Sequence, residues 1–211
     1  MYTVLDFETT GLNYKREQVI EISALKLNEE FEEIGSYNTF VALGFGRQLP
    51  QLITDLTSIT PLDLKFGMQE AFAMQMLVEF IGFDTVVAQY APFDLAFLAD
   101  KTYFEPKRFI CTKSLTSIVE PNENSSLVPT CERLGIKLEG AHRAINDCRA
   151  TAEVLKHRLQ KDKMDSEYVF NTLCLTEGRP LNFIPKYTRY MLRKGGGLLA
   201  DFTEVKGMEW F

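Results

Sequence analysis

Cysteine and histidine are scarce in this sequence, which has four cysteines and two histidines among its 211 residues. The cysteines, at positions 111, 131, 148 and 174, include no Cys-x-x-Cys pair. Zinc sites and disulfide frameworks depend on regular cysteine spacing, so neither is expected to organise this chain. The four thiols are therefore predicted to be free and buried.

Long apolar runs are also missing. No stretch of about 18 apolar residues is free of charges, which predicts a chain without a membrane span. Asp6 and Glu8 interrupt the first apolar run, so the N-terminus does not have the pattern of a signal peptide. Together these absences predict a cytoplasmic protein. Apolar residues still make up 45% of the sequence, enough for the core of one domain with a short extension.

Positive charge is scarce over most of the chain, and the net charge is −6. Taken as a total, this charge argues against a nucleic-acid partner. The distribution is uneven, however, because residues 178–200 hold five basic residues and no acid. Part of the acidic excess comes from the glutamates between positions 29 and 33, whose pattern predicts a solvated hairpin turn.

The apolar periodicity predicts an α/β fold. Short apolar runs indicate strands over residues 2–7, 18–27, 33–43, 85–89 and 108–111. Helical spacing indicates helices from about residue 52 and over 69–81, 91–99, 115–119, 127–134 and 144–159. In the 69–81 helix, the predicted buried face holds Phe72, Met76, Leu77 and Phe80. These elements predict a mixed sheet flanked by helices over residues 1–160, followed by an extension of unassigned role over 161–211.

The first motif with chemical character is Asp6-Phe7-Glu8, at the end of the first predicted strand. Alternate residues of a strand point to the same face, so Asp6 and Glu8 lie side by side. Two adjacent carboxylates repel each other unless a cation lies between them, and Mg²⁺ and Mn²⁺ prefer such oxygen ligands. The alternative is a strand end with two solvated acids.

The second motif is Ala91-Pro92-Phe93-Asp94, after the predicted strand at 85–89. Proline suits the first turn of a helix, which places Asp94 in that turn. An acid at this position is also favoured by the helix dipole alone, so the motif by itself does not require a site.

The third motif is His142-Arg143-Ala144-Ile145-Asn146-Asp147. Five residues do not return to one helical face, so His142 is expected in the turn before the helix and Asp147 one turn inside it. The alternative is a surface histidine followed by an exposed helical acid. His157, on the same predicted helix, has no comparable motif around it.

Taken together and in this order, the three motifs resemble the DEDDh 3′–5′ exonucleases of the ribonuclease H-like fold. This family includes the proofreading epsilon subunit of bacterial replicative polymerase, ribonuclease T and oligoribonuclease. The resemblance covers residues 2–159 and extends to the stretch Leu56-Thr57-Ser58-Ile59-Thr60. Three ordered motifs are far more specific than any one of them.

The resemblance implies two divalent metal ions, Mg²⁺ or Mn²⁺, held by four acids. Asp6 would lie between the ions, Glu8 and Asp147 would complete the first site, and Asp94 would serve the second site or act through water. Such ion pairs support in-line displacement at phosphorus. His142 would accept the proton of the attacking water, a task that suits the pKa of histidine near neutral pH.

The resemblance also implies a place for the substrate. Thr9, Thr10, Gly11 and Leu12 would receive the terminal nucleotide through backbone amides and a leucine wedge, or they form an ordinary turn with a core leucine. Members of the family often carry histidine or asparagine near the second motif, where this chain has Gln89-Tyr90. Tyr90 is a candidate for stacking on a base or for filling the core.

The expected function is a 3′–5′ exonuclease that releases nucleoside 5′-monophosphates from single-stranded 3′ ends. DNA proofreading or repair is the first choice of substrate, and a small-RNA exonuclease is the alternative. A polymerase-associated subunit that docks through residues 161–211 is a further alternative. Basic and aromatic residues interleave over 186–190, which suits either a nucleic-acid surface or an amphipathic helix with a solvated basic face.

Overall fold

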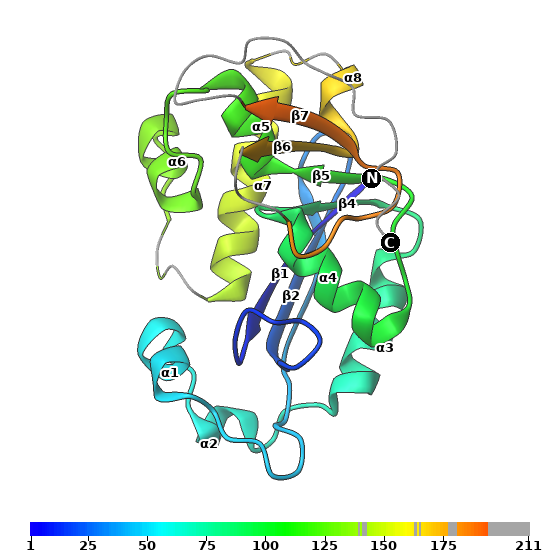
Figure 1. Cartoon of the computed structure of the whole chain (residues 1–211), viewed down its shortest axis with the longest axis vertical. Helices are drawn as coiled ribbons and strands as arrows, with labels where there is room; N and C mark the ends of the chain where they lie inside the picture. The colour runs from blue at the N-terminus through cyan, green and yellow to red at the C-terminus, as the bar shows by residue number, and fades with distance from the viewer. Residues whose placement is uncertain (139, 141–142, 163, 165, 177–180, 194–211) are drawn as a thin grey trace.

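The computed structural model describes residues 1–138, 140, 143–162, 164, 166–176 and 181–193. At its centre is a five-stranded sheet in the order β3-β2-β1-β4-β5 (Figure 1). The strands of this sheet are β1 (Tyr2–Thr9), β2 (Val19–Leu27), β3 (Glu33–Phe40), β4 (Thr85–Ala88) and β5 (Phe109–Cys111). The helices are α1 (Gln51–Thr57), α2 (Pro61–Leu64), α3 (Glu70–Ile81), α4 (Ala91–Thr102), α5 (Thr112–Val119), α6 (Leu127–Leu134), α7 (Ala144–Gln160) and α8 (Ser166–Val169).

The sheet is mixed, as the sequence predicted. β2 runs antiparallel to both β1 and β3, and the turn between β2 and β3 carries the exposed glutamates. β4 runs parallel to β1, and β5 runs parallel to β4. Parallel neighbours need crossover connections, and the chain provides them with α3 before β4 and α4 before β5.

Each face of the sheet is covered by its own helices, and β1 contributes to both cores. Leu5 and Phe7 pack in one core with residues of α3 and α4. Val4 packs in the other core with residues of α5 and α7. Because side chains alternate along a strand, Asp6 and Glu8 project on the same side as Val4, toward α7.

Helix α3 buries a different face from the one that the sequence predicted. Its buried residues are Ala73, Met74, Leu77 and Ile81. Phe72 and Met76, which the sequence placed on the buried face, are 56% and 42% exposed, so that prediction is wrong for both. The helix is apolar around much of its circumference, and its packing against the sheet decides which apolar side chains are buried.

The extension adds α8 and a second, two-stranded sheet in which β6 (Thr172–Thr176) runs parallel to β7 (Arg189–Arg193). Residues 186–190 form a turn that leads into β7, so the alternative of an amphipathic helix there is wrong. Asn171 ties the extension to β5, because its N–H donates to the carbonyl of Phe109 at 2.8 Å and its Oδ1 accepts from the N–H of Phe109 at 2.7 Å. The carbonyl of Asn171 also accepts from the N–H of Arg189 at 2.7 Å.

All four cysteines are free thiols, as predicted. Cys111, Cys131 and Cys148 are buried, whereas Cys174 is only partly buried. Burial raises the pKa of the Cys148 thiol well above its ordinary value, and the nearby acids raise it further. The Cys148 thiol therefore stays protonated and serves packing.

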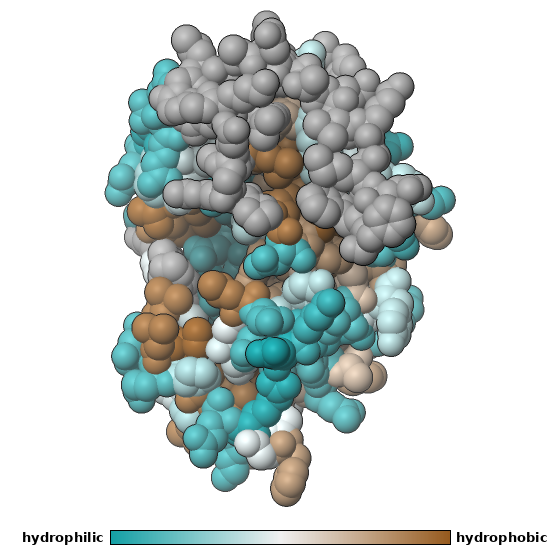
Figure 2. Space-filling model, in the orientation of Figure 1, coloured by the Kyte–Doolittle hydropathy of each residue, from teal (hydrophilic) through white to brown (hydrophobic). Residues whose placement is uncertain are grey.

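Exposed apolar side chains occur at many places on the surface. Among the described helices, none combines the length and the apolar character that crossing a membrane requires. On the face drawn in Figure 2, apolar side chains gather over α1. There and in α2, Leu52, Leu56 and Leu62 are 75%, 50% and 70% exposed.

Candidate active site

Four carboxylates meet at the carboxyl end of β1, and we refer to Asp6, Glu8, Asp94 and Asp147 as the carboxylate cluster. β4 pairs with β1 only over Tyr2–Val4, so β1 continues past the end of its parallel neighbour. The chain then enters α4, whose first turn carries Asp94. The N–H of Phe7 donates to Oδ1 of Asp94 at 3.3 Å, which holds this acid against the free edge of β1.

Three members of the cluster face one another directly. Asp6, Glu8 and Asp147 each present a carboxylate oxygen, and these oxygens lie within 4.8 Å of one another. Asp147 reaches the group from the first turn of α7, which packs over β1 and β2. Asp94 completes the cluster from the α4 side and is only 3% exposed.

The electrostatics of the cluster are unfavourable without a cation. Burial, followed by Asp94 and the other acids, raises the pKa of Asp6 well above its ordinary value. Burial and the neighbouring acids also raise the pKa of Glu8 from 4.5 to about 8. The pKa of Asp94 is raised to about 8, mainly by burial. Each shift has the sign expected when ionised carboxylates are crowded in a poorly solvated place.

The carboxylate cluster therefore fits divalent cations. Its donors are all oxygens, as Mg²⁺ and Mn²⁺ prefer, and the spacing of three of them suits one shared ion. A bound cation would remove the repulsion that raises the pKa values of these acids.

Glu21 is a further buried acid, which the sequence analysis did not single out. It lies directly opposite Glu8 in the β1–β2 ladder and is 1% exposed. Arg143 pairs with it at 3.0 Å, and the N–H of Ala144 donates to its Oε2 at 3.2 Å. Glu21 thus fixes the start of α7, the helix that carries Asp147. A single carboxylate inside the apolar run Val19-Ile20-Glu21-Ile22 was the available signal.

His142 lies outside the described residues, so its predicted position in the turn before α7 stays a prediction. Arg143, the residue that follows it, is the residue immediately before α7 and is held by Glu21. Its guanidinium also lies 5.5 Å from the ring centroid of Phe40. Glu21 and Phe40 thus both contact the residue that follows His142 in the chain.

The predicted substrate loop is stabilised by its own hydrogen bonds. The hydroxyl of Thr9 donates to the carbonyl of Gly11 at 2.7 Å, and the hydroxyl of Thr10 donates to Glu17 at 2.6 Å. The N–H of Thr10 donates to the carbonyl of Gln18, so this amide is occupied within the loop. A Cβ at position 11 would lie 3.1 Å from the Glu17 side chain, so a larger residue there would require that side chain to shift.

Leu12 is 81% exposed, which makes the core-leucine alternative wrong. Tyr90 is 41% exposed and likewise does not fill the core. The ammonium of Lys113 lies 4.8 Å from the centroid of the Tyr90 ring. Both side chains therefore present apolar surface to solvent.

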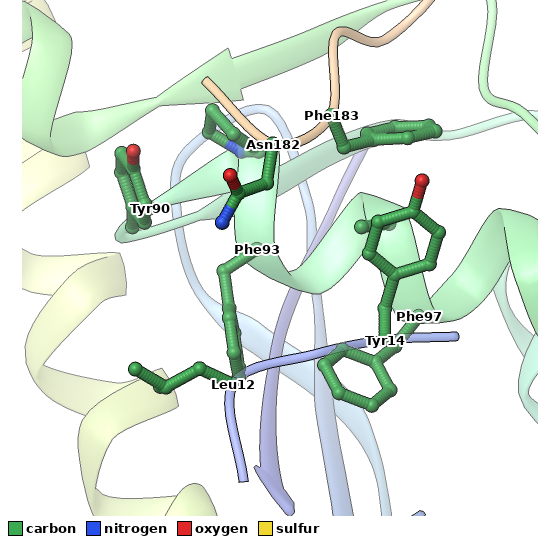
Figure 3. Close-up of a pocket in the computed structure, with 9 residues that line it drawn as sticks. Leu12, Tyr14, Tyr90, Phe93, Phe97, Asn182 and Phe183 are labelled. Carbon is green, nitrogen blue, oxygen red and sulfur yellow. The ribbon is translucent and has the colours of Figure 1, made fainter. Parts of the chain in front are cut away.

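Leu12 and Tyr90 lie on the rim of a cavity of about 80 Å³, which we call the aromatic pocket (Figure 3). The residues that line it are Leu12, Tyr14, Tyr90, Pro92, Phe93, Ala96, Phe97, Asn182 and Phe183. Most of them follow β1 or belong to the start of α4, and two come from the extension. Phe93 is the neighbour of Asp94 in the chain, so the start of α4 contributes one residue to the pocket and the next to the carboxylate cluster.

Comparison with known proteins decides the family. Residues 3–155 match the family described as exonuclease. The chain belongs to the exonuclease family. Members of this family are hydrolases that depend on divalent metal ions, and the carboxylate cluster supplies oxygen ligands of the kind such ions use. The resemblance read from the three motifs is thereby confirmed.

Curated relatives of this exonuclease include DNA polymerase III proteins of the PolC type and a DNA polymerase III subunit epsilon. It is 35% identical to the PolC-type DNA polymerase III of Clostridium perfringens over 173 residues, which is 79% of this chain and 12% of that protein. It is 29% identical to DNA polymerase III subunit epsilon of Aquifex aeolicus over 159 residues, which is 72% of this chain and 77% of that protein. The chain thus spans about an eighth of the PolC relative, against 77% of the epsilon subunit.

Solved structures support the fold. The nuclease domain of the DEDDh family member 3′hExo, bound to rAMP, superposes with a TM-score of 0.65 at 18% identity, covering 76% of this chain and 92% of that one. At this identity the likeness shows the fold alone. The predicted ribonuclease H-like mixed sheet with flanking helices is confirmed.

Proposed function

We propose that this chain is a 3′–5′ exonuclease of the DNA proofreading type, which hydrolyses the terminal phosphodiester bond and releases nucleoside 5′-monophosphates. The observation that carries the proposal is the carboxylate cluster, in which β1, α4 and α7 bring acids from distant parts of the sequence to one place. Burial and mutual repulsion disfavour the ionised form of these carboxylates, and bound cations would stabilise it.

Two divalent ions, Mg²⁺ or Mn²⁺, would be held by the carboxylate cluster, with Asp6 shared between them. Glu8 and Asp147 would complete one site, and Asp94 would serve the other directly or through water. When bound, such ions lower the pKa of water and stabilise charge on the attacking and leaving oxygens of an in-line displacement. The spacing of the Asp6, Glu8 and Asp147 oxygens supports the first of these sites.

The chain's own groups would orient the substrate and move the proton. His142 would accept the proton of the attacking water, and the Glu21–Arg143 pair beside it would hold the start of α7. The loop over residues 9–12 would receive the terminal nucleotide, with Leu12 as an apolar wedge. The internal hydrogen bonds of this loop keep it rigid, which favours a productive geometry.

DNA is proposed as the substrate because the relatives above are DNA polymerase III proteins. A nuclease that serves a polymerase must receive a single-stranded 3′ end, and association with a polymerase through the extension at 161–211 is part of the proposal. Ribonucleotide chains are the second candidate, since the solved neighbour that superposes on this fold holds rAMP.

Labelled DNA and RNA oligonucleotides, single- and double-stranded, would be incubated with the purified protein and Mg²⁺ or Mn²⁺. The expected result is stepwise shortening of single-stranded DNA from the 3′ end, with nucleoside 5′-monophosphates as products and no reaction in EDTA. Faster shortening of RNA would replace the DNA assignment. Activity that persists in EDTA, or that starts at the 5′ end, would overturn the proposal.

A polymerase partner is tested separately by capture with the full chain and with a chain ending at residue 160. Capture of a replicative polymerase by the full chain alone is the expected result. Equal capture by both chains would show that residues 161–211 do not dock it. A folded state of the shortened chain would first be checked by circular dichroism.

A further inference from the structure

The extension contributes to the wall of the aromatic pocket, although the family match ends at residue 155. Phe183 packs against Tyr14, with ring centroids 5.8 Å apart and planes at 71°. Leu181 and Phe183 also pack against the core that contains Leu5 and Phe7. The segment 181–183 is therefore seated on the domain by apolar contacts.

Asn182 stands between these two apolar anchors and is exposed. In Figure 3 its side-chain amide points down toward Phe93, into the space between Tyr90 and Tyr14. Within the described part of the chain, no hydrogen bond to the Asn182 amide is found. An amide offers one donor group and one acceptor side by side, so a ligand in the pocket meets both.

The remaining surface of the pocket suits a flat ring. Tyr90 and Phe93 present aromatic faces, and Leu12 adds an exposed apolar edge. Aromatic walls bind any nucleobase by stacking, and they do so without distinguishing its edge. Discrimination needs a polar group that reaches that edge, and asparagine forms a bidentate pair with adenine most readily.

Position in the chain links this pocket to the carboxylate cluster. Phe93 precedes Asp94, and Leu12 follows Glu8 after three residues of the tightly bonded loop. A nucleotide whose phosphate lay at the carboxylate cluster would thus have its base within reach of the aromatic pocket.

We propose that Asn182 and Phe183 complete the pocket for the 3′-terminal nucleobase and that the Asn182 amide selects among bases, with adenine preferred. This inference rests on the proposed exonuclease function. It assigns the first part of the extension to substrate selection, which leaves the later part for other contacts.

The test compares kcat/KM on single-stranded oligonucleotides that differ only in the 3′-terminal base, for the wild type, Asn182→Leu and Asn182→Asp. Wild-type protein should favour terminal adenine, and Asn182→Leu should reduce this preference about 5- to 20-fold, the effect of losing one or two neutral hydrogen bonds. Asn182→Asp keeps an acceptor for the adenine amino group and loses the donor, so its preference should fall between the other two.

A binding measurement provides a readout that does not depend on turnover. By titration calorimetry with Mg²⁺, dAMP should bind Asn182→Leu about 5- to 20-fold more weakly than wild type, whereas 2′-deoxyribose 5-phosphate should bind both equally. Tyr187→Asn is the matched control, because Tyr187 is 66% exposed on the same extension and does not line the pocket. Asparagine also tolerates the positive φ of 64° at this position.

The outcomes separate the inference from the proposed function. Wild-type protein that shortens oligonucleotides with a base preference unchanged in Asn182→Leu would overturn the role of Asn182 and leave the exonuclease intact. Wild-type protein that shortens no oligonucleotide would overturn the proposed function instead. A preference lost in Tyr187→Asn as well would show that the extension acts as a whole and not through Asn182.

Discussion

Asp94 and Phe93 are neighbours in α4, but one belongs to the carboxylate cluster and the other to the aromatic pocket. The cluster is made of charged groups that repel one another, and its acids are held by strand pairing and by the start of two helices. The pocket is made of neutral rings and one amide, and part of its wall is supplied by the extension. Because of this difference, we expect substitutions in the cluster to alter the catalytic rate and substitutions in the pocket to alter which substrate is favoured.

The largest effect is expected from Asp6→Asn. Loss of the shared carboxylate should lower kcat by about 10³-fold or more, since metal ions contribute several kcal/mol of charge stabilisation in the transition state. The metal-free variant should also unfold at a higher temperature than wild type, because one of the repelling charges is gone. Oligonucleotide shortening and thermal unfolding in EDTA measure the two effects. Asp100→Asn, at the far end of α4, is the matched control. An Asp6→Asn variant with wild-type activity would contradict the role of the carboxylate cluster in catalysis.

His142→Ala should come next, with kcat lowered roughly 10²–10⁴-fold, the usual cost of losing a general base. Mn²⁺ affinity, measured by calorimetry, should stay within a few-fold of wild type, because the carboxylate cluster remains. His157→Ala provides the control, since that histidine lies far along α7 beside Asp162. Equal losses of affinity and rate would mean that His142 belongs with the metal ligands.

Substitution of the Glu21–Arg143 pair tests how the cluster is held in place. Arg143→Gln leaves a carboxylate that is 1% exposed without its partner and beside Glu8, whereas Glu21→Gln leaves a guanidinium that is 40% exposed. Arg143→Gln should therefore cost more, by about 2 kcal/mol of unfolding free energy, after allowance for the exposure of the arginine. Urea unfolding of both variants and of the double variant measures this. Arg149→Gln is the control, because Arg149 pairs with Glu33 at 3.7 Å on the surface. A larger loss in Glu21→Gln would contradict the argument.

The raised pKa values predict how the stability of the metal-free protein depends on pH. The pKa of Glu8 is about 8 in the folded protein against an ordinary value of 4.5, so between these values the folded state binds more protons than the unfolded state. Stability should then fall as pH rises from 5 to 8, and Tm should fall by about 2–4 °C for each kcal/mol lost. Calorimetry in EDTA checks the sign, and Mn²⁺ should raise Tm more at pH 8 than at pH 5. A metal-free Tm that rises over this range would contradict the assignment.

The smallest effect is expected in the pocket. Leu12→Ala should raise KM about 3- to 10-fold with kcat nearly unchanged, because an apolar contact made equally in the ground and transition states affects binding alone. Steady-state kinetics on one oligonucleotide separate the two constants. Leu52→Ala, on the exposed surface of α1, is the control. A fall in kcat would show that the loop also aligns the reacting groups.

Patterns in the sequence predicted the parts that depend on neighbouring residues. Alternation along β1 placed Asp6 and Glu8 together, and proline and helix signals placed Asp94 and Asp147 in the first turns of their helices. The roles of these residues and of His142 stay predictions. These positions could be predicted because strand alternation and helix starts depend on only a few neighbouring residues.

Features that depend on distant contacts were not predicted. The buried face of α3 is set by the sheet beneath it, and Glu21 becomes important only because strand register puts it opposite Glu8. The parallel pair β6 and β7 joins segments separated by a long connection. Asn182 and Phe183 likewise reach the pocket only through tertiary packing, which no local pattern encodes.

The contacts of Asn171 have a consequence for self-association. An open sheet can be extended at either edge by a strand from another molecule, which is a common start of aggregation. At the β5 edge, Asn171 already occupies the N–H and carbonyl of Phe109. A chain ending at residue 160 would uncover the β5 edge, and increased light scattering on concentration would reveal it. The extension thus blocks the pairing of β5 with strands of other molecules.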